Sequence, residues 1–220
     1  MADSYADRHQ APLHELEALL NTIGAKLQTD VTAYLIGGCA MSMRGLKDAT
    51  KDADIIVRTA GDRAAIRTVM EILGFELLQG GPFQRTLPKE YEGFHGDLWR
   101  LPGQVGLDVF ERTIMEDRFV LTDSMAERAT EVRKHGRLTV RLCSNEDIFL
   151  FKSLTSRPGD IPDIMRLVQT GLDIPVMAQE LRSQPVRKGK AWPDHVVEQL
   201  EKLEVRSRGL IPWKYELLGD

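Results

Sequence analysis

The chain has 220 residues and a mass of 24.8 kDa, which is enough for one sizeable domain or for a domain with a helical appendage. Its hydrophobic content of 42% and charged content of 28% are typical of a soluble globular protein. A net charge of -4 and an isoelectric point near 5.8 argue against a protein that binds nucleic acid over its whole surface, but they leave a local basic patch open.

Neither membrane insertion nor a disulfide framework is expected. No apolar run is long enough to span a bilayer, and the first residues lack the charged and apolar regions of a signal peptide, so we expect a cytoplasmic protein. Cys39 and Cys143 are the only cysteines and have no Cys-x-x-Cys spacing, which argues against a zinc site. Cys39 is expected to be a small buried filler rather than a reactive thiol.

The first elements lead to a glycine pair. Leucine and isoleucine recur at helical spacing over 11–28, which predicts an amphipathic helix, and the apolar run over 32–36 predicts a strand. This strand stops at Gly37-Gly38, and good helix formers follow. Glycines at such a turn let a ligand approach the backbone closely, and the amides of a helix start suit a phosphate.

A pair of carboxylates begins the next predicted strand, 53–57. Side chains alternate along a strand, so Asp52 and Asp54 are expected to share one face. The two charges would repel each other unless a cation lay between them, and oxygen ligands suit Mg²⁺ or Mn²⁺. The alternative is a tight turn followed by a solvated strand start.

The middle of the chain adds a third acid. A helix is predicted over 63–73 and short strands over 75–78 and 83–87, around a turn at Gly80-Gly81-Pro82, with a loop from Pro88 to Gly96. The strand predicted over 105–110 contains Asp108 among apolar residues. Burying an unpaired charge is costly, so Asp108 needs a partner unless it faces water on an edge strand.

The last third is expected to be mainly helical. After a helical turn at 123 and a strand over 137–142, Ser144 is the predicted N-cap of a helix, and further helices follow over 176–183 and 194–205. Lys152 interrupts an apolar helix, where it needs a phosphate or carboxylate partner unless it snorkels to the surface. The basic connector 184–193, with Trp192, could contact RNA and stack a base, although a solvated loop is favoured.

Taken in order, an apolar strand, Gly37-Gly38, a helix and Thr50-x-Asp52-x-Asp54 resemble the nucleotidyltransferase signature of the DNA polymerase beta superfamily. Cys39 to Lys51 lie between the two motifs, near the long end of the spacing in that superfamily. The resemblance implies that Asp108 is a third carboxylate that completes a metal site with Asp52 and Asp54.

A second resemblance lies in the C-terminal part. The order Lys152, Arg157, Asp160, Asp163 is similar to that of minimal nucleotidyltransferases, including those that act as toxins or sit in abortive-infection loci. It implies that Lys152 lies near the nucleotide phosphates and that Arg157 pairs with Asp160 or Asp163. Replacement of Lys152 should then weaken triphosphate binding and leave the fold intact.

We therefore expect an α/β fold, a small mixed sheet flanked by helices, with a nucleotidyltransferase-like catalytic domain over 1–143 and a helical region over 144–220 packed on it. The implied function is transfer of a nucleoside monophosphate from a nucleoside triphosphate such as ATP. Asp52, Asp54 and Asp108 are the expected catalytic and metal-binding residues for Mg²⁺ or Mn²⁺, and Gly37, Gly38 and Lys152 are expected to bind the nucleotide.

The acceptor stays open, with a tRNA end, a protein hydroxyl or a small molecule such as an aminoglycoside as candidates. Two other classes of function also stay open. One is a non-catalytic nucleotide-binding module, and the other is a member of a toxin–antitoxin pair with an antitoxin partner.

Overall fold

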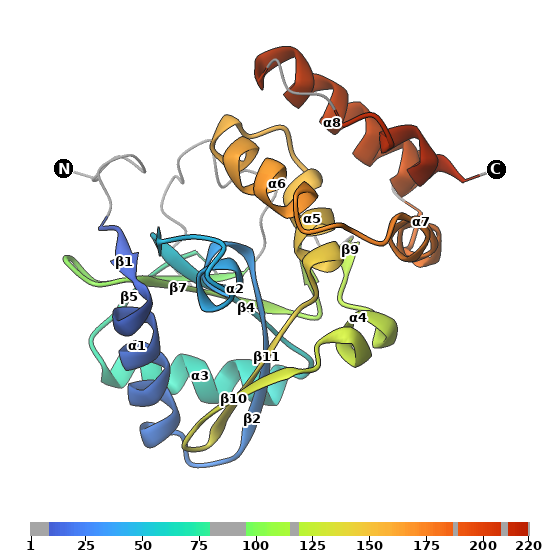
Figure 1. Cartoon of the computed structure of the whole chain (residues 1–220). Coiled ribbons are helices and arrows are strands. Elements are labelled where there is room, and N and C mark those ends of the chain that lie inside the picture. The colour runs from blue at the N-terminus through green and yellow to red at the C-terminus, as the bar shows by residue number, and fades with distance from the viewer. Residues whose placement is uncertain (1–8, 80–95, 115–118, 187–188, 208–210, 220) are drawn as a thin grey trace.

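The computed structural model describes residues 9–79, 96–114, 119–186, 189–207 and 211–219. Its centre is a seven-stranded mixed sheet, in which the central β4 runs parallel to β7 and antiparallel to β2 (Figure 1). In spatial order the strands are β10 (Glu131–His135), β11 (Leu138–Leu142), β2 (Val31–Ile36), β4 (Asp52–Val57), β7 (Gly106–Glu111), β6 (Asp97–Arg100) and β5 (Glu76–Gln79). Two short ladders accompany it, β1 (Ala11–Pro12) with β3 (Ala49–Thr50) and β8 (Thr113–Ile114) with β9 (Phe119–Val120). The predicted α/β class and mixed sheet are confirmed.

Helices surround this sheet. They are α1 (Leu13–Lys26), α2 (Gly37–Met43), α3 (Ala60–Ile72), α4 (Asp123–Arg128), α5 (Asn145–Ser153), α6 (Ile161–Val168), α7 (Ile174–Ser183) and α8 (Trp192–Ser207), with the 3₁₀ helices η3 (Pro158–Asp160) and η4 (Lys214–Leu218). The helix α1 packs against β10 and β11, and α3 packs against β2, β4 and β7. The helices α5 to α8 gather on another side of the molecule (Figure 1), which confirms the helical C-terminal part.

The contact between α1 and the β10–β11 turn is made backbone to backbone. A side chain on Gly24 would begin 1.5 Å from the carbonyl oxygen of His135, and the amide of Arg137 donates to the Gly24 carbonyl at 3.1 Å. Opposite it, Gly136 has a φ of 60°, and a Cβ there would lie 2.9 Å from the Gly24 oxygen. Glycine at both positions therefore lets the hairpin lie directly on the helix.

The connector before α8 does not present its tryptophan to solvent. Trp192 is 1% exposed, and its ring packs edge-on against Phe119 with centroids 5.0 Å apart. Its indole nitrogen donates to the carbonyl of Pro185 at 2.6 Å. Both the favoured prediction of a solvated loop and the alternative of a base-stacking side chain were wrong for Trp192, because the residue begins α8 and its ring lies in the core.

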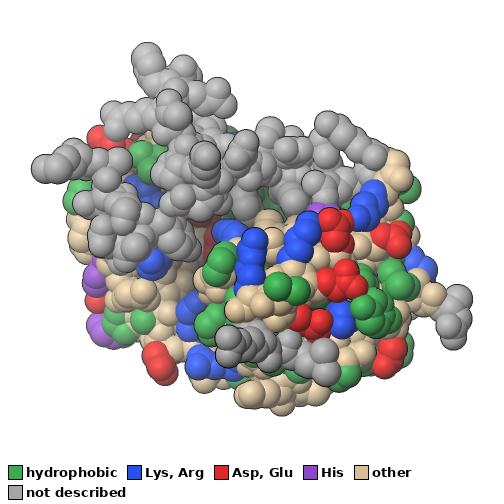
Figure 2. Space-filling view, turned by 90° about the horizontal axis from the view of Figure 1, so that it is seen from above, with side chains coloured by type: hydrophobic (Ala, Val, Ile, Leu, Met, Phe, Trp, Pro, Cys, Tyr) green, Lys and Arg blue, Asp and Glu red, His purple; other side chains and the backbone are tan. Residues whose placement is uncertain are grey.

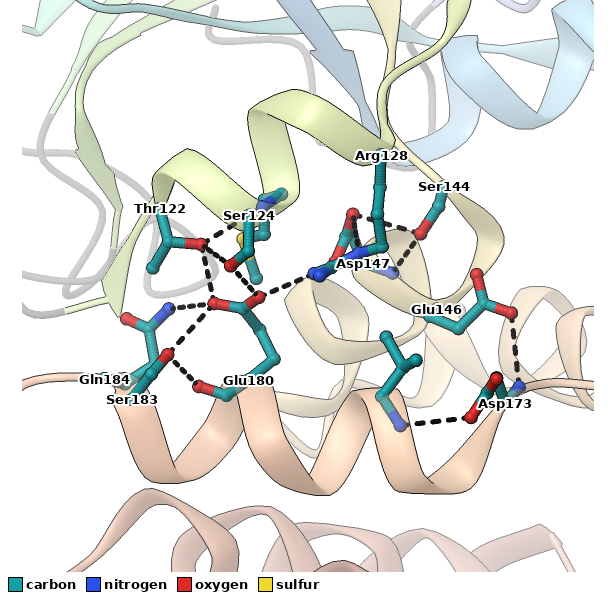
Figure 3. Close-up of polar contacts among 12 residues, drawn as sticks. Thr122, Ser124, Arg128, Ser144, Glu146, Asp147, Asp173, Glu180, Ser183 and Gln184 are labelled. Carbon is teal, nitrogen blue, oxygen red and sulfur yellow. Dashed lines mark hydrogen bonds and ion pairs between the residues drawn. The ribbon is translucent and has the colours of Figure 1, made fainter.

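A buried polar network joins α4, α5 and α7 (Figure 3). The guanidinium of Arg128 donates to Asp147 and to Glu180, each at 2.6 Å. Glu180 also accepts from the hydroxyls of Thr122 at 2.6 Å and Ser124 at 2.7 Å. Since the three helices contribute one charged residue each, the network fixes their mutual positions. At its edge the Ser144 hydroxyl accepts from the Asp147 amide at 3.2 Å, which confirms the predicted N-cap.

Three sequence predictions fall outside the described residues: the turn at Gly80-Gly81-Pro82, the strand over 83–87 and nearly all of the loop over 88–96. Among the described helices, none is both long and apolar enough to cross a membrane. On the face seen in Figure 2, lysine and arginine side chains are interspersed with aspartate and glutamate. The division of the chain at 143/144 stays a prediction.

Candidate functional site

Strand pairing brings the three predicted acids to one region of the sheet. Asp54 of β4 stands opposite Asp108 of the parallel neighbour β7, and Asp52 stands opposite Gly106. On the other side of β4, Asp54 pairs with Ile36, the last residue of β2 before the glycine turn. Because residues two apart on a strand share a face, Asp52, Asp54 and Asp108 lie on the same face.

The glycine turn lies directly against these acids. Gly37 has a φ of 63°, and a Cβ there would lie 2.4 Å from the Oδ2 atom of Asp54. A Cβ on Gly38 would lie 2.5 Å from the hydroxyl oxygen of Thr50. The turn therefore needs glycine at both positions, one for backbone conformation and contact with the carboxylate, the other for contact with β3.

The charges around Asp54 disfavour its ionised form. Burial, followed by the negative charges of Asp108 and Asp52, raises its pKa to about 8, although Lys152 and Arg157 act in the opposite direction. The side chain of Asp54 is nevertheless only half-buried, unlike those of Asp52 and Asp108. In the absence of an added cation, these surroundings therefore favour the protonated form of Asp54.

Arg100, at the end of β6, is a residue of this site that the sequence analysis did not identify. Its Nη1 atom donates to Oδ1 of Asp108, and its Nη2 atom lies 3.3 Å from Oδ1 of Asp52. The side chain is 14% exposed. No strand was predicted over 97–100, so nothing in the sequence indicated that this arginine would face the acids.

The chemistry of these side chains suits a divalent metal, because three carboxylates from adjacent strands offer hard oxygen ligands. The guanidinium of Arg100 already bridges two of these carboxylates. Yet among the described residues no three His, Cys, Asp or Glu side chains are grouped to hold a metal ion as they stand. At this site Asp52 and Asp108 contact the guanidinium instead. Asp52, Asp54 and Asp108 are thus the residues that could hold a metal once the guanidinium moves.

Lys152 lies in a buried ion cluster with the acids of η3 and α6. Its ammonium is 3.0 Å from Oδ1 of Asp160 and 2.8 Å from Oδ2 of Asp163, and the residue is 7% exposed. Arg157 donates to Asp160 at 2.8 Å, as the resemblance implied. The snorkelling alternative for Lys152 was therefore wrong, while its role toward a phosphate stays a prediction.

Lys47 is a second cation that the sequence analysis did not single out. Its ammonium lies 2.7 Å from Oδ2 of Asp163, so one carboxylate oxygen receives both Lys47 and Lys152. A Cβ on Gly38 would lie 3.4 Å from the Lys47 nitrogen, which places this charge beside the glycine turn. The one indication in the sequence that Lys47 could lie at the site was its position between the glycine pair and the acid pair.

The cysteines take no part in the chemistry of the site. Both are buried, and burial raises the pKa of the Cys39 and Cys143 thiols far above the ordinary value. The prediction that Cys39 is a buried filler is confirmed.

The chain is similar to proteins of known structure and matches a protein family. The chain is similar to an antigenic nucleotidyltransferase-like protein from Paracoccidioides brasiliensis whose crystal structure is known, with 17% sequence identity, coverage of 91% of this chain and 92% of that one, and a TM-score of 0.44. None of the curated proteins matches. The family match extends over residues 12–188, a span that contains the glycine turn, the three acids and Lys152, and the chain therefore belongs to the family described as nucleotidyltransferase of unknown function (DUF6036).

Proposed function

We propose that the protein transfers a nucleoside monophosphate from a nucleoside triphosphate to an acceptor hydroxyl or phosphate, with release of pyrophosphate, and that it uses Mg²⁺ or Mn²⁺. The observation that carries the proposal is the placement of Asp52, Asp54 and Asp108 on one face of the sheet, directly against the Gly37-Gly38 turn. Membership of a nucleotidyltransferase family supports it.

Each acid has a role in this proposal. Asp52 and Asp54 of β4 would hold the metal together with Asp108 of the neighbouring strand β7. A bound divalent metal would neutralise charge on the phosphates during transfer. Asp108 also orients the acceptor hydroxyl or takes its proton, since its strand is adjacent to β4 and its carboxylate lies on the same face.

The phosphates are received by the glycine turn and the two lysines. Gly37 and Gly38 carry no side chains, so only their backbone would face a phosphate bound beside Asp54 and Thr50. Lys152 supplies positive charge from the buried cluster, and Lys47 supplies it beside Gly38. A polyphosphate at the turn would compete with Asp163 for the Lys47 ammonium.

The acceptor can be a tRNA end, a protein hydroxyl or a small molecule. The burial of Trp192 removes one contact that would have favoured RNA. Incubation of a lysate with a nucleoside triphosphate labelled in the α-phosphate would identify the acceptor by transfer of the label. A binding module or an antitoxin-bound partner without activity would bind the nucleotide but label nothing.

Calorimetry tests the proposal. Wild type should bind a nucleoside triphosphate in magnesium and much more weakly in excess chelator, and Asp54→Asn should bind weakly in both, because it lacks one metal ligand. Glu127→Gln, an exposed change in α4, is the control and should behave like wild type. Equal affinity of wild type in magnesium and in chelator would contradict the metal-dependent proposal.

A further inference from the structure

We propose that Arg100 is the built-in counter-ion of the acidic site, and that its guanidinium must leave Asp52 and Asp108 before a divalent cation can bind between them. In this role Arg100 is a positioning residue that sets the metal affinity of the site. The inference rests on the metal role in the proposed function, but it concerns metal binding alone and needs no nucleotide or acceptor.

The path of the Arg100 side chain crosses a strand. Arg100 is on β6 and Asp52 is on β4, with β7 between them. Neighbouring strands are about 4.8 Å apart, so the two backbones are separated by roughly 10 Å. A long side chain can span this gap only if the residue between leaves the surface of β7 open.

Gly106 leaves that surface open. It is the cross-strand partner of Asp52, and a Cβ on Gly106 would lie 2.5 Å from Oδ1 of Asp52 and 2.8 Å from Nη1 of Arg100. Any side chain there would collide with both members of the ion pair. The strand is thus shaped for a guanidinium that lies across it, which a surface ion pair would not require.

The guanidinium occupies one oxygen of each of the two carboxylates between which a metal would bind. The side chains of Arg100, Asp52 and Asp108 are 14%, 10% and 8% exposed, so the pairs are largely withdrawn from water. Two cations held on the same pair of carboxylates would repel each other strongly in such surroundings. Without any cation, the three acids would repel one another instead. One cation therefore replaces the other.

The exchange predicts that removal of Arg100 improves metal binding. Arg100→Gln keeps a polar side chain of moderate length but removes the charge and the paired donors. In calorimetric titrations with Mn²⁺ alone, its dissociation constant should be at least about tenfold lower than that of wild type, equivalent to the loss of a competing interaction of ~1.4 kcal/mol. Arg67→Gln is the matched control: Arg67 pairs with the buried Asp97 on the same strand, which Arg63 also contacts, so its Mn²⁺ affinity should equal that of wild type.

Thermal unfolding with and without metal separates a role of Arg100 as counter-ion from a purely structural role. In chelator, Arg100→Gln should melt below wild type because the acids lose their counter-ion, and Mn²⁺ should restore most of the difference. If Arg100→Gln does not fold in chelator, refolding it with Mn²⁺ decides, since a metal can take the place of the guanidinium. A variant that stays unfolded with metal overturns the inference.

The Mn²⁺ titrations also distinguish failure of the inference from failure of the proposed metal role. If wild type binds Mn²⁺ and Arg100→Gln binds it equally or more weakly, the exchange is wrong and the metal role in the proposed function stands. If neither protein binds Mn²⁺, the exchange and that metal role fail together.

Discussion

The carboxyl group of Asp54 is held in surroundings that oppose its ionisation. Burial and the charges of Asp108 and Asp52 raise its pKa to about 8, and the Gly37 backbone closes over it so tightly that a Cβ would lie 2.4 Å from Oδ2. Such a cost in stability persists in proteins mainly where a function requires the group. Substitution of this acid should therefore have the opposite effect to most buried substitutions.

Asp54→Asn should leave the melting temperature in chelator unchanged or raise it, because the amide keeps the shape of the side chain but cannot acquire the negative charge that burial, Asp108 and Asp52 disfavour. Most buried polar substitutions instead lower stability by roughly 0.5–3 kcal/mol. Magnesium with a nucleoside triphosphate should stabilise wild type and have much less effect on the variant. A clear loss of stability in chelator, together with a wild-type response to metal, would show that the acid is structural.

Lys152→Met should be strongly destabilising, which differs from the expectation drawn from the sequence that the fold would stay intact. The ammonium lies between Asp160 and Asp163 in a buried cluster, so its removal leaves carboxylates without a full counter-charge. Breaking a buried ion pair from one side costs about 3–5 kcal/mol. Urea unfolding of the variant measures this, and a cost below about 1 kcal/mol would place the cluster in the range of surface pairs.

Lys47→Met is the better probe of phosphate binding. Its side chain is 27% exposed, and Asp163 keeps Lys152 as a partner after the change. If Lys47 contacts the phosphates, triphosphate affinity in magnesium should fall by roughly 1.5–3 kcal/mol, the range for a hydrogen bond to a charged group. Lys134→Met, an exposed change on β10, should have no effect on affinity. If wild type, Lys47→Met and Lys134→Met bind the triphosphate with equal affinity, Lys47 serves only its ion pair with Asp163 and does not contact the phosphates.

The three acids of the site and Lys152 could be predicted from the sequence, whereas Arg100 and Lys47 were not. Alternation along a single strand fixes which side chains share a face, so the spacing of Asp52 and Asp54 was sufficient. The position of Arg100 depends on which strand lies beside β7 and on the absence of a side chain at Gly106. Both are properties of strand pairing between distant segments, which local patterns do not contain.

At the level of elements, two strands of the seven-stranded sheet, β10 and β6, went unpredicted because charged residues interrupt their apolar pattern. The strand β10 has the sequence Glu-Val-Arg-Lys-His and lies at the edge of the sheet, where polar residues face water and no apolar alternation develops. The strand β6 has only four residues, beginning and ending with charged side chains that are paired in the fold. In contrast, β2, β4, β7 and β11 lie inside the sheet and their apolar runs predicted them within one residue.

The network between α4, α5 and α7 makes stability depend on pH through Glu180. Burial raises the pKa of this carboxyl, but hydrogen bonds from Thr122, Arg128 and Ser124 outweigh burial and place it below the ordinary 4.5. The unfolded chain therefore binds the proton more readily than the folded one. The stability that Glu180 contributes is present above pH 4.5 and is lost as the pH falls through the lower pKa of the folded state.

Glu180→Gln should accordingly lower the free energy of unfolding by about 1–3 kcal/mol at pH 7, with a smaller difference from wild type below about pH 4.5. Urea unfolding of both proteins at several pH values measures this, with Glu127→Gln as the exposed control on α4. A difference that does not change with pH would mean that the loss comes from packing rather than from charge.

For the whole molecule, the buried core extends across the predicted boundary at 143/144. Buried residues of the sheet, such as Leu35 and Val140, belong to the same hydrophobic cluster as Phe149 of α5 and Leu200 of α8. The sequence could show where the strands end and the helices begin, since the spacing of apolar residues changes there from that of a strand to that of a helix. It could not show that both parts share one core, because that depends on how the helices pack.

We expect the full chain to unfold in one cooperative transition, with equal calorimetric and van't Hoff enthalpies. A fragment of residues 1–143 should fail to give a cooperative melt, because the surfaces that α5 and α8 cover would be exposed. Two separate transitions in the full chain, or a cooperative melt of the fragment, would support two independent domains instead.

The backbone contact between Gly24 and the β10–β11 turn bears on how a mutational scan of this protein should be interpreted. At Gly24 a methyl group would overlap the His135 carbonyl, just as one at Gly37 would overlap Asp54. A screen that scores activity alone would rank the two glycines together, although Gly24 belongs to a packing contact. Measuring protein abundance beside activity would separate them, since loss at Gly24 should follow abundance.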